Sequence, residues 1–258
     1  MKNKFEEFLE LHRKTAPLLI GTVWNVQSAK VLEQQKLKAI GTSSAAVAES
    51  LGYADGQEMG IEEYLFIIRR IAASVSLPFT VDLEAGYGAT PAEIAKVIDR
   101  LYETGVSGIN IEDSIVTDGK RSILRAEDFA EKLRQLIKLL DAAKTRMFIN
   151  VRCDSFLLGL PHAVEDAVAR IKLYQDTGVH GLFFPCITKI TDIERITEES
   201  KLPINVMCMP DLPDFKQLQE AGVKRISMGP FLNHHIYQGM GTMAEKIMAE
   251  GSFASLFR

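Results

Sequence analysis

Eight short apolar runs, separated by longer amphipathic stretches, constrain the fold of this chain more than any other feature. The runs are mostly continuous rather than alternating, which is typical of strands buried on both faces of a parallel sheet. The stretches between them place apolar residues at helical spacing, as in residues 60–75. The runs occupy residues 18–24, 38–44, 78–85, 108–113, 147–154, 181–187, 204–210 and 225–230.

Glycine and proline mark the ends of the predicted helices. Thr90-Pro91 has the cap-and-proline pattern that opens a helix. Glycines such as Gly105 and Gly178 stand where a left-handed helix end precedes the next strand. Eight strand–helix units predict an α/β fold of the (β/α)8 TIM-barrel type. A doubly wound sheet is the alternative, but residues 86–88 lack the third glycine of a dinucleotide-binding turn.

The composition fits one enzyme-sized domain and excludes several classes of protein. Its 258 residues are 47% hydrophobic and 25% charged, as in a globular protein, and suffice for one barrel. We expect a single domain over 1–258, with an N-terminal helix and a terminal helix over about 231–250. A net charge of −4 excludes a nucleic-acid partner, and no apolar run is long enough for a membrane span. The polar N-terminus and the unpaired spacing of Cys153, Cys186 and Cys208 favour a cytoplasmic protein.

Polar side chains gather where the predicted strands end, which is where barrel enzymes place their active sites. Alternation along the third run puts Asp82 and Glu84 on the same side of the strand. Clustered carboxylates repel one another unless a cation lies between them, and Mg²⁺ is the hard oxygen-seeking ion that fits, with Mn²⁺ as a substitute. An arginine on the adjacent strand would hold a carboxylate or a developing enolate oxygen. The residues are Ser43, Ser44, Ala45, Asp55, Asp82, Glu84, Glu112 and Arg152.

Each of these residues also has a structural explanation when it is taken alone. A single acid at a strand end is more often a helix cap or an ion-pair partner than a ligand. Ser43 and Ser44 would serve as caps, and Asp113 and Asp154 as turn or cap residues. The joint pattern of Asp82, Glu84, Glu112 and Arg152 on three successive strand ends is harder to explain as structure alone. His162, His234 and His235 form no ligand spacing with an acid, so we interpret them as structural.

Over nearly its whole length the sequence resembles the isocitrate lyase / phosphoenolpyruvate mutase superfamily, in its phosphoenolpyruvate mutase-like branch. Together the matching phrases are highly specific, although each alone is weak. The phrases are Val23-Trp24-Asn25 with Ser28-Ala29, KAIGTSSAAVAESLGYADG (38–56), VDLEAGYG (81–88), GINIED (108–113), KRS (120–122), NVRCDS (150–155) and RISMGP (225–230).

The resemblance implies a (β/α)8 barrel whose last helix is swapped between subunits, and a homo-oligomer that is a dimer of dimers. It implies Mg²⁺ and a small 2-oxo or 2-hydroxy carboxylate substrate, with C–C or P–C chemistry through an enolpyruvate-like intermediate. Asp55, Arg152 and Lys120 then take catalytic roles, with Lys120 on a mobile gating loop that also carries Arg121. Ser43, Ser44 and Ala45 would bind the substrate carboxylate through backbone amides, together with Arg152. The metal acids would be Asp82, Glu84 and Glu112.

The gating loop departs from the pattern of the lyase branch. That branch has a cysteine as its proposed general acid, whereas this chain has Ser122, and serine is a far poorer proton donor than a thiol. The resemblance therefore leaves a phosphonomutase or phosphonopyruvate hydrolase and an oxaloacetate decarboxylase-like enzyme ahead of a substituted-malate (methylisocitrate-type) lyase. A non-catalytic carboxylate-binding relative is the alternative from another class. A Schiff-base aldolase is disfavoured because no predicted strand ends in lysine.

Overall fold

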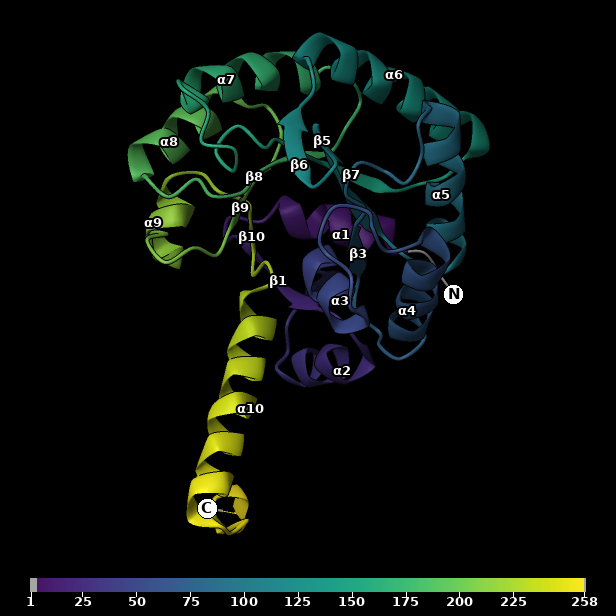
Figure 1. Ribbon diagram of the computed structural model, residues 1–258. Coiled ribbons are helices and arrows are strands. Elements are labelled where there is room, and N and C mark those ends of the chain that lie inside the picture. The colour runs from purple at the N-terminus through teal and green to yellow at the C-terminus, as the bar shows by residue number, and fades with distance from the viewer. Residues whose placement is uncertain (1–3, 258) are drawn as a thin grey trace.

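The computed structural model describes residues 4–257, and within them eight parallel strands close into a barrel (Figure 1). The strand order around the barrel is β1-β10-β9-β8-β7-β4-β3-β2, and each strand coincides with a predicted run. This confirms the (β/α)8 barrel. The strands are β1 (Leu18–Val23), β2 (Ala39–Thr42), β3 (Phe79–Asp82), β4 (Gly108–Glu112), β7 (Phe148–Arg152), β8 (Gly181–Phe184), β9 (Ile204–Met207) and β10 (Arg225–Ser227).

Helices pack around the outside of this barrel and bury the apolar faces that the sequence predicts (Figure 1). Thr90 accepts a hydrogen bond from the Glu93 amide and Glu93 bonds back, so the expected start of α5 is a capping box. Gly105 and Gly178 have φ values of 90° and 93°, the left-handed conformation that ends a helix. The helices are α2 (Val26–Gln34), α3 (Ser44–Leu51), α4 (Ile61–Ala72), α5 (Pro91–Glu103), α6 (Ala126–Ala143), α7 (Ala163–Tyr174), α8 (Ile190–Glu199) and α9 (Phe215–Glu220).

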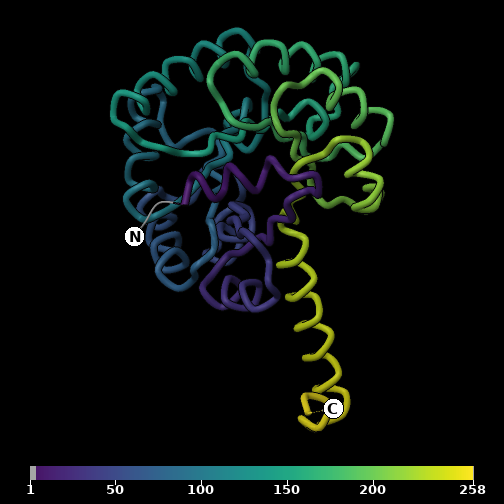
Figure 2. The backbone as a smooth tube through the Cα atoms, turned by 180° about the vertical axis from the view of Figure 1, so that it is seen from behind, coloured from purple at the N-terminus to yellow at the C-terminus, as the bar shows by residue number. Residues whose placement is uncertain are grey.

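The helix α1 (Phe5–His12) lies across the end of the barrel that faces the viewer in Figure 2. The buried Phe8 ring contacts Phe148 of β7 edge-on, and the His12 ring stacks on the same phenyl group. The His12 Nδ1–H donates to the Phe8 carbonyl over 2.8 Å. This aromatic cluster seals the N-terminal end of the barrel, so the opposite end is left for a functional site.

A two-stranded antiparallel hairpin stands at that opposite end, where the sequence predicts a loop. It consists of β5 (Ser114–Thr117) and β6 (Lys120–Ile123). The turn residues Asp118 and Gly119 both have positive φ, 50° and 71°, which is the geometry of a tight hairpin turn. The hairpin carries Lys120 and Arg121 above the ends of the barrel strands.

The helix α10 (Phe231–Glu250) covers the range of the expected terminal helix and projects away from the barrel as a single arm (Figures 1 and 2). Its surface carries exposed apolar side chains, among them Ile236, Tyr237, Met240 and Met248. Exchange of this helix between subunits stays a prediction. No helix within residues 4–257 combines the length and the apolar character that crossing a membrane requires.

Candidate active site

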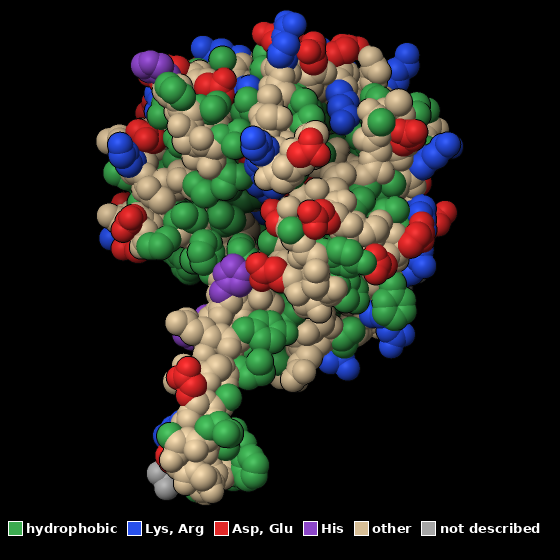
Figure 3. Space-filling view, in the orientation of Figure 1, with side chains coloured by type: hydrophobic (Ala, Val, Ile, Leu, Met, Phe, Trp, Pro, Cys, Tyr) green, Lys and Arg blue, Asp and Glu red, His purple; other side chains and the backbone are tan. Residues whose placement is uncertain are grey.

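A cavity of about 490 Å³ opens at the C-terminal end of the barrel. Figure 3 shows it as a hollow with hydrophobic side chains on one side and charged side chains on the other. Its apolar wall includes Phe183, Pro185 and Met207. Six of the residues singled out from the sequence line it: Ser43, Ser44, Ala45, Asp55, Asp82 and Arg152.

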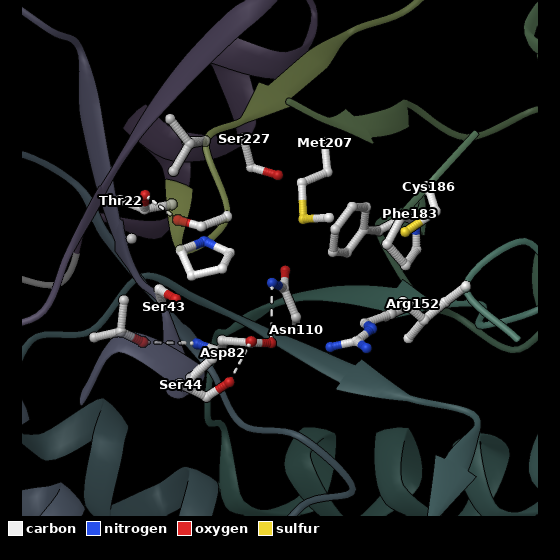
Figure 4. A pocket seen from close by; sticks show the side chains of 18 of the residues that line it. Thr22, Ser43, Ser44, Asp82, Asn110, Arg152, Phe183, Cys186, Met207 and Ser227 are labelled. Atoms are coloured by element: carbon white, nitrogen blue, oxygen red, sulfur yellow. Dashed lines mark hydrogen bonds between the residues drawn. The ribbon is translucent and has the colours of Figure 1, made fainter. Parts of the chain in front are cut away.

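Asp82 is the last residue of β3, and its carboxylate lies in the cavity wall (Figure 4). Its Oδ2 accepts from the Ser44 hydroxyl over 2.8 Å, and its Oδ1 accepts from the Asn110 amide over 3.3 Å. The Asp82 backbone N–H donates to Thr42 Oγ1 on the neighbouring strand. These contacts fix the carboxylate, while each oxygen keeps a lone pair for a further ligand.

Ser43 and Ser44 stand where β2 turns into α3, and they do different things. Ser43 is the helix cap, because its side chain accepts from the Ala46 amide. The Ser44 hydroxyl instead orients Asp82. The first-turn amides of α3, at Ser44 and Ala45, have no acceptor within the helix and lie beside the cavity, so a carboxylate is the group they suit.

The alternation predicted from the sequence fails at Glu84. The strand ends at Asp82, and Glu84 has a left-handed φ of 51°, so its side chain lines an adjacent hollow together with Glu112. It is 2% exposed, Tyr87 donates to its Oε1, and its Oε2 has no hydrogen-bond partner. Burial raises the pKa of Glu84 to about 8, and the charges of Asp55, Asp82 and Glu112 add to the shift.

Arg152 ends β7 and is already engaged by two buried carboxylates. Its Nη1 lies 3.0 Å from Glu112, and its Nε donates to Asp154 over 2.6 Å. Burial raises the pKa of Glu112, and Arg152 and Arg121 oppose that shift. The guanidinium therefore holds the carboxylates of two neighbouring strand ends together at the rim of the cavity.

The hairpin brings Arg121, not Lys120, into this cluster. Arg121 forms ion pairs with Asp55, Glu112 and Asp154, whereas Lys120 is exposed and stands outside the cavity lining. Partial burial raises the pKa of the Asp55 carboxyl, the charge of Asp82 adds to the rise, and Arg121 opposes it. The ion pairs of Arg121 with these carboxylates hold the hairpin closed over the rim of the cavity.

The residues present fit a hard divalent cation. Within residues 4–257, carboxyl groups outnumber guanidinium groups at this rim, and the donors are oxygens, with one orphaned at Glu84 Oε2. No three His, Cys, Asp or Glu side chains of the described chain form an all-protein metal cage. Mg²⁺ commonly binds through one or two carboxylates and several waters, so Asp82 with water-linked Glu84 and Glu112 suits it.

Among the cavity residues that sequence reasoning did not assign to the site are Asn110, Cys186 and Arg225. A signal for Asn110 was available, since it lies two residues before Glu112 on β4 and faces the same interior. Arg225 lies at the start of β10, a position from which only a long side chain reaches the cavity. Cys186 has a φ of 66° just beyond β8, which no pattern in the sequence marks.

Comparison with known proteins places the chain among enzymes of related chemistry. The sequence profile of the family described as phosphoenolpyruvate phosphomutase matches residues 8–248. An oxaloacetate decarboxylase of Bradyrhizobium sp. (strain BTAi1) is 30% identical over 194 residues, covering 71% of this chain and 64% of that protein. The phosphonopyruvate hydrolase of Variovorax sp. (strain Pal2) is 25% identical over 228 residues, covering 84% and 76%.

A second lyase and a solved structure extend the same likeness. The 2-methylisocitrate lyase of Escherichia coli (strain K12) is 27% identical over 199 residues, covering 74% of this chain and 65% of that protein. A crystal structure from Burkholderia cenocepacia J2315 is 32% identical with a TM-score of 0.88, and the match covers 95% of this chain and all of that one.

Proposed function

Because the chain belongs to the phosphoenolpyruvate phosphomutase family, we propose that it is a Mg²⁺-dependent lyase or isomerase. It cleaves or rearranges a C–C or P–C bond in a small 2-oxo or 2-hydroxy carboxylate through an enolpyruvate-like intermediate. One observation carries this proposal: the Asp82 carboxylate, the first-turn amides of α3 and Arg152 all face one cavity. We also infer a cytoplasmic homo-oligomer that is a dimer of dimers.

Some residues of the cavity bind the substrate, and others stabilise the charge that develops on it. The Ser44 and Ala45 amides bind the substrate carboxylate at the positive end of α3. Arg152 supplies positive charge at the rim, where an enolate oxygen develops. Bound at Asp82, and through water at Glu84 and Glu112, Mg²⁺ would supply Lewis-acid stabilisation of the same charge.

Asp55 and the hairpin control protons and water. Burial raises the pKa of Asp55, which suits a group that takes or returns a proton, and Asp55 lines the cavity. The ion pair of Arg121 with Asp55 keeps the hairpin over the cavity and excludes water. Opening of the hairpin would break this pair and let the substrate in.

The position of Ser122 favours the decarboxylase-like and phosphonate reactions over cleavage of a substituted malate. Ser122 is exposed on β6 and lies outside the cavity lining, whereas a lyase of that kind needs a proton donor at the substrate. Oxaloacetate decarboxylase, phosphonomutase and phosphonopyruvate hydrolase activities therefore lead, and a methylisocitrate-type lyase is the alternative.

A turnover screen followed by ¹H and ³¹P NMR tests this function. The protein is incubated with Mg²⁺ and phosphonopyruvate, oxaloacetate or 2-methylisocitrate, beside Arg152→Ala and the matched surface variant Arg195→Ala. We expect one substrate to be consumed by the wild type and by Arg195→Ala, with a loss of at least about 100-fold in Arg152→Ala. Equal turnover by both variants, or turnover that survives removal of Mg²⁺, contradicts the proposal.

A non-catalytic carboxylate-binding protein is the second candidate, and the exposed Ser122 favours it. Such a protein would bind oxalate tightly with Mg²⁺ but consume none of the three substrates. Lys120→Ala would then leave binding unchanged, whereas a catalytic Lys120 requires turnover to fall in that variant. Absence of oxalate binding in the wild type would remove both candidates.

A further inference from the structure

Three arginine side chains line the cavity, and two of them already have carboxylate partners. Arg152 pairs with Glu112 and Asp154, and Arg121 pairs with Asp55, Glu112 and Asp154. Arg225 has none, since no carboxylate of residues 4–257 lies within ion-pair distance of it. The uncommitted positive charge of the cavity is therefore on Arg225, not at the rim.

Arg225 is buried and keeps unused hydrogen-bond donors. It is 1% exposed, and its Nη2 donates to Asn110 Oδ1 over 3.2 Å, while Nε and Nη1 have no hydrogen-bond partner. Burial lowers the pKa of Arg225 to about 9, which leaves the group charged at neutral pH. An unpaired buried charge is costly, so the fold keeps this group at the expense of stability.

The barrel interior around Arg225 is polar, whereas barrel interiors are usually filled by branched apolar side chains. Asn150 donates to Asn110 over 2.9 Å and to Asn205 over 3.2 Å. Thr80 is 2% exposed, lines the cavity and has no hydrogen-bond partner at Oγ1. In Figure 4, Asn110 lies between Asp82 on one side and Ser227 on the other.

We propose that Arg225, with Asn110 and Thr80, forms an anion-binding floor of the cavity. This floor takes the second anionic group of the substrate, a carboxylate or a phosphonate, at the end remote from α3. The inference rests on the proposed function, because the first-turn amides of α3, beside Mg²⁺ held at Asp82, must bind the first carboxylate. One amide side chain, that of Asn110, bridges Asp82 and Arg225, so the two ends of the site are linked through a single side chain. The floor therefore selects substrates with two anionic groups over monocarboxylates.

A purely structural role for Arg225 makes different predictions. The guanidinium lies 5.8 Å from the centre of the Phe8 ring, so it also contributes to packing against α1. If packing were its purpose, Arg225→Met would lower the melting temperature and weaken every ligand alike. If the floor is an anion site, the variant keeps or raises the melting temperature, because an unpaired buried charge is removed.

The test compares ligands that reach the floor with one that does not. Dissociation constants are measured by calorimetry with Mg²⁺ for oxalate, 3,3-difluorooxaloacetate and sulfopyruvate, in wild type, Arg225→Met, Arg225→Lys and Thr80→Val. We expect Arg225→Met to weaken the two longer ligands by about 100-fold and oxalate by less than about threefold. Arg225→Lys should weaken the binding of these two ligands less than Arg225→Met does. Thr80→Val should weaken their binding several-fold. The longer ligand whose affinity falls more shows whether the floor prefers a planar carboxylate or a tetrahedral oxyanion, for which the sulfonate of sulfopyruvate is the probe.

The outcomes separate this inference from the function on which it rests. Equal weakening of all three ligands, or unchanged binding of all three, overturns the floor. If the wild type does not bind oxalate but binds the longer ligands through Arg225, the proposed function fails and the floor stands. If the wild type binds none of them, both proposals are overturned.

Discussion

Asp113 is a carboxylate that the fold buries completely and then satisfies from several directions. It is 0% exposed, and it accepts from Asp154 N–H over 3.0 Å, Arg170 Nη1 over 3.1 Å and the Tyr174 hydroxyl over 3.0 Å. Because it follows Glu112 directly, these bonds also fix the strand end that carries the site. Arg170 of α7 thereby connects the outer helix ring to the active-site rim.

Replacing Arg170 by methionine should therefore destabilise the protein far more than replacing a surface arginine. Arg170→Met leaves the Asp113 carboxylate buried beside fewer donors, and we expect the free energy of unfolding to fall by about 3–5 kcal/mol in urea titration. Arg134→Met is the control, since its exposed ion pair with Glu131 is worth less than about 1 kcal/mol. Similar losses in the two variants would contradict this account of Asp113.

Individual site residues were predictable only where strand position alone decides their direction. Asp82 and Arg152 end regular strands, so the strand-end rule sufficed to place them in the cavity. Glu84 lies past the strand, where a left-handed φ cancels the alternation. Arg121 was recognised on the right segment, but its contact with Asp55 spans 66 residues of sequence, which no local pattern encodes.

The helix α1 makes the stability of the barrel sensitive to acid. Burial lowers the pKa of His12 to about 3, and the charge of Arg225 adds to this effect. The unfolded chain, with an ordinary histidine pKa of about 6.5, binds a proton that the folded chain does not take up. The contribution of His12 is therefore present above pH 6.5 and is lost as the pH falls toward 3.

The lowered pKa of His12 gives a prediction for how the stability of the protein depends on pH. Between pH 7 and pH 5, His12 should reduce the free energy of unfolding by about 2 kcal/mol. His12→Phe keeps the ring against Phe148 and should remove that part of the slope, whereas the exposed His235→Gln should leave the slope unchanged. Chemical denaturation at several pH values measures it, and an unaltered slope in His12→Phe would show that another group is responsible.

Among the elements, the barrel strands were foreseen and the hairpin β5–β6 was not. Strands buried on both faces leave continuous apolar runs, and helix ends leave caps such as Thr90 and glycines such as Gly105. The hairpin strands are short and polar, with Lys120 and Ser122 exposed, so they carry no apolar run to detect. The direction of α10 could not be predicted either. An amphipathic helix has the same sequence pattern whether it packs on its own barrel or on that of another subunit.

At the scale of the whole molecule, an apolar groove beside β10 and β1 is left unfilled by the helices of residues 4–257. Because α10 projects away, a groove of about 830 Å³ remains there, with Leu19 and Ile226 among its lining residues. Exposed apolar side chains of α10, such as Ile236 and Met240, are of the kind that would fill it. The predicted exchange of α10 between subunits would cover both surfaces at once.

Light scattering on size-exclusion fractions tests this exchange. The wild type should elute as a tetramer or dimer, and Met240→Glu should shift it toward the monomer because a charge would enter an apolar contact. Glu245→Gln, an exposed change on the same helix, should leave the assembly intact. A wild type that is monomeric at all concentrations would refute the exchange.

The projecting arm has a consequence for mixtures of chains. If each groove is filled by the α10 of a neighbour, the melting temperature rises with protein concentration, since assembly and folding share one equilibrium. A chain truncated before Phe231 would then bind the α10 of a neighbour in its groove but would have no α10 to place in another groove. Co-expressed with full-length chains, the truncated chain would act as a dominant inhibitor, because it binds a partner's α10 in an assembly that cannot be completed.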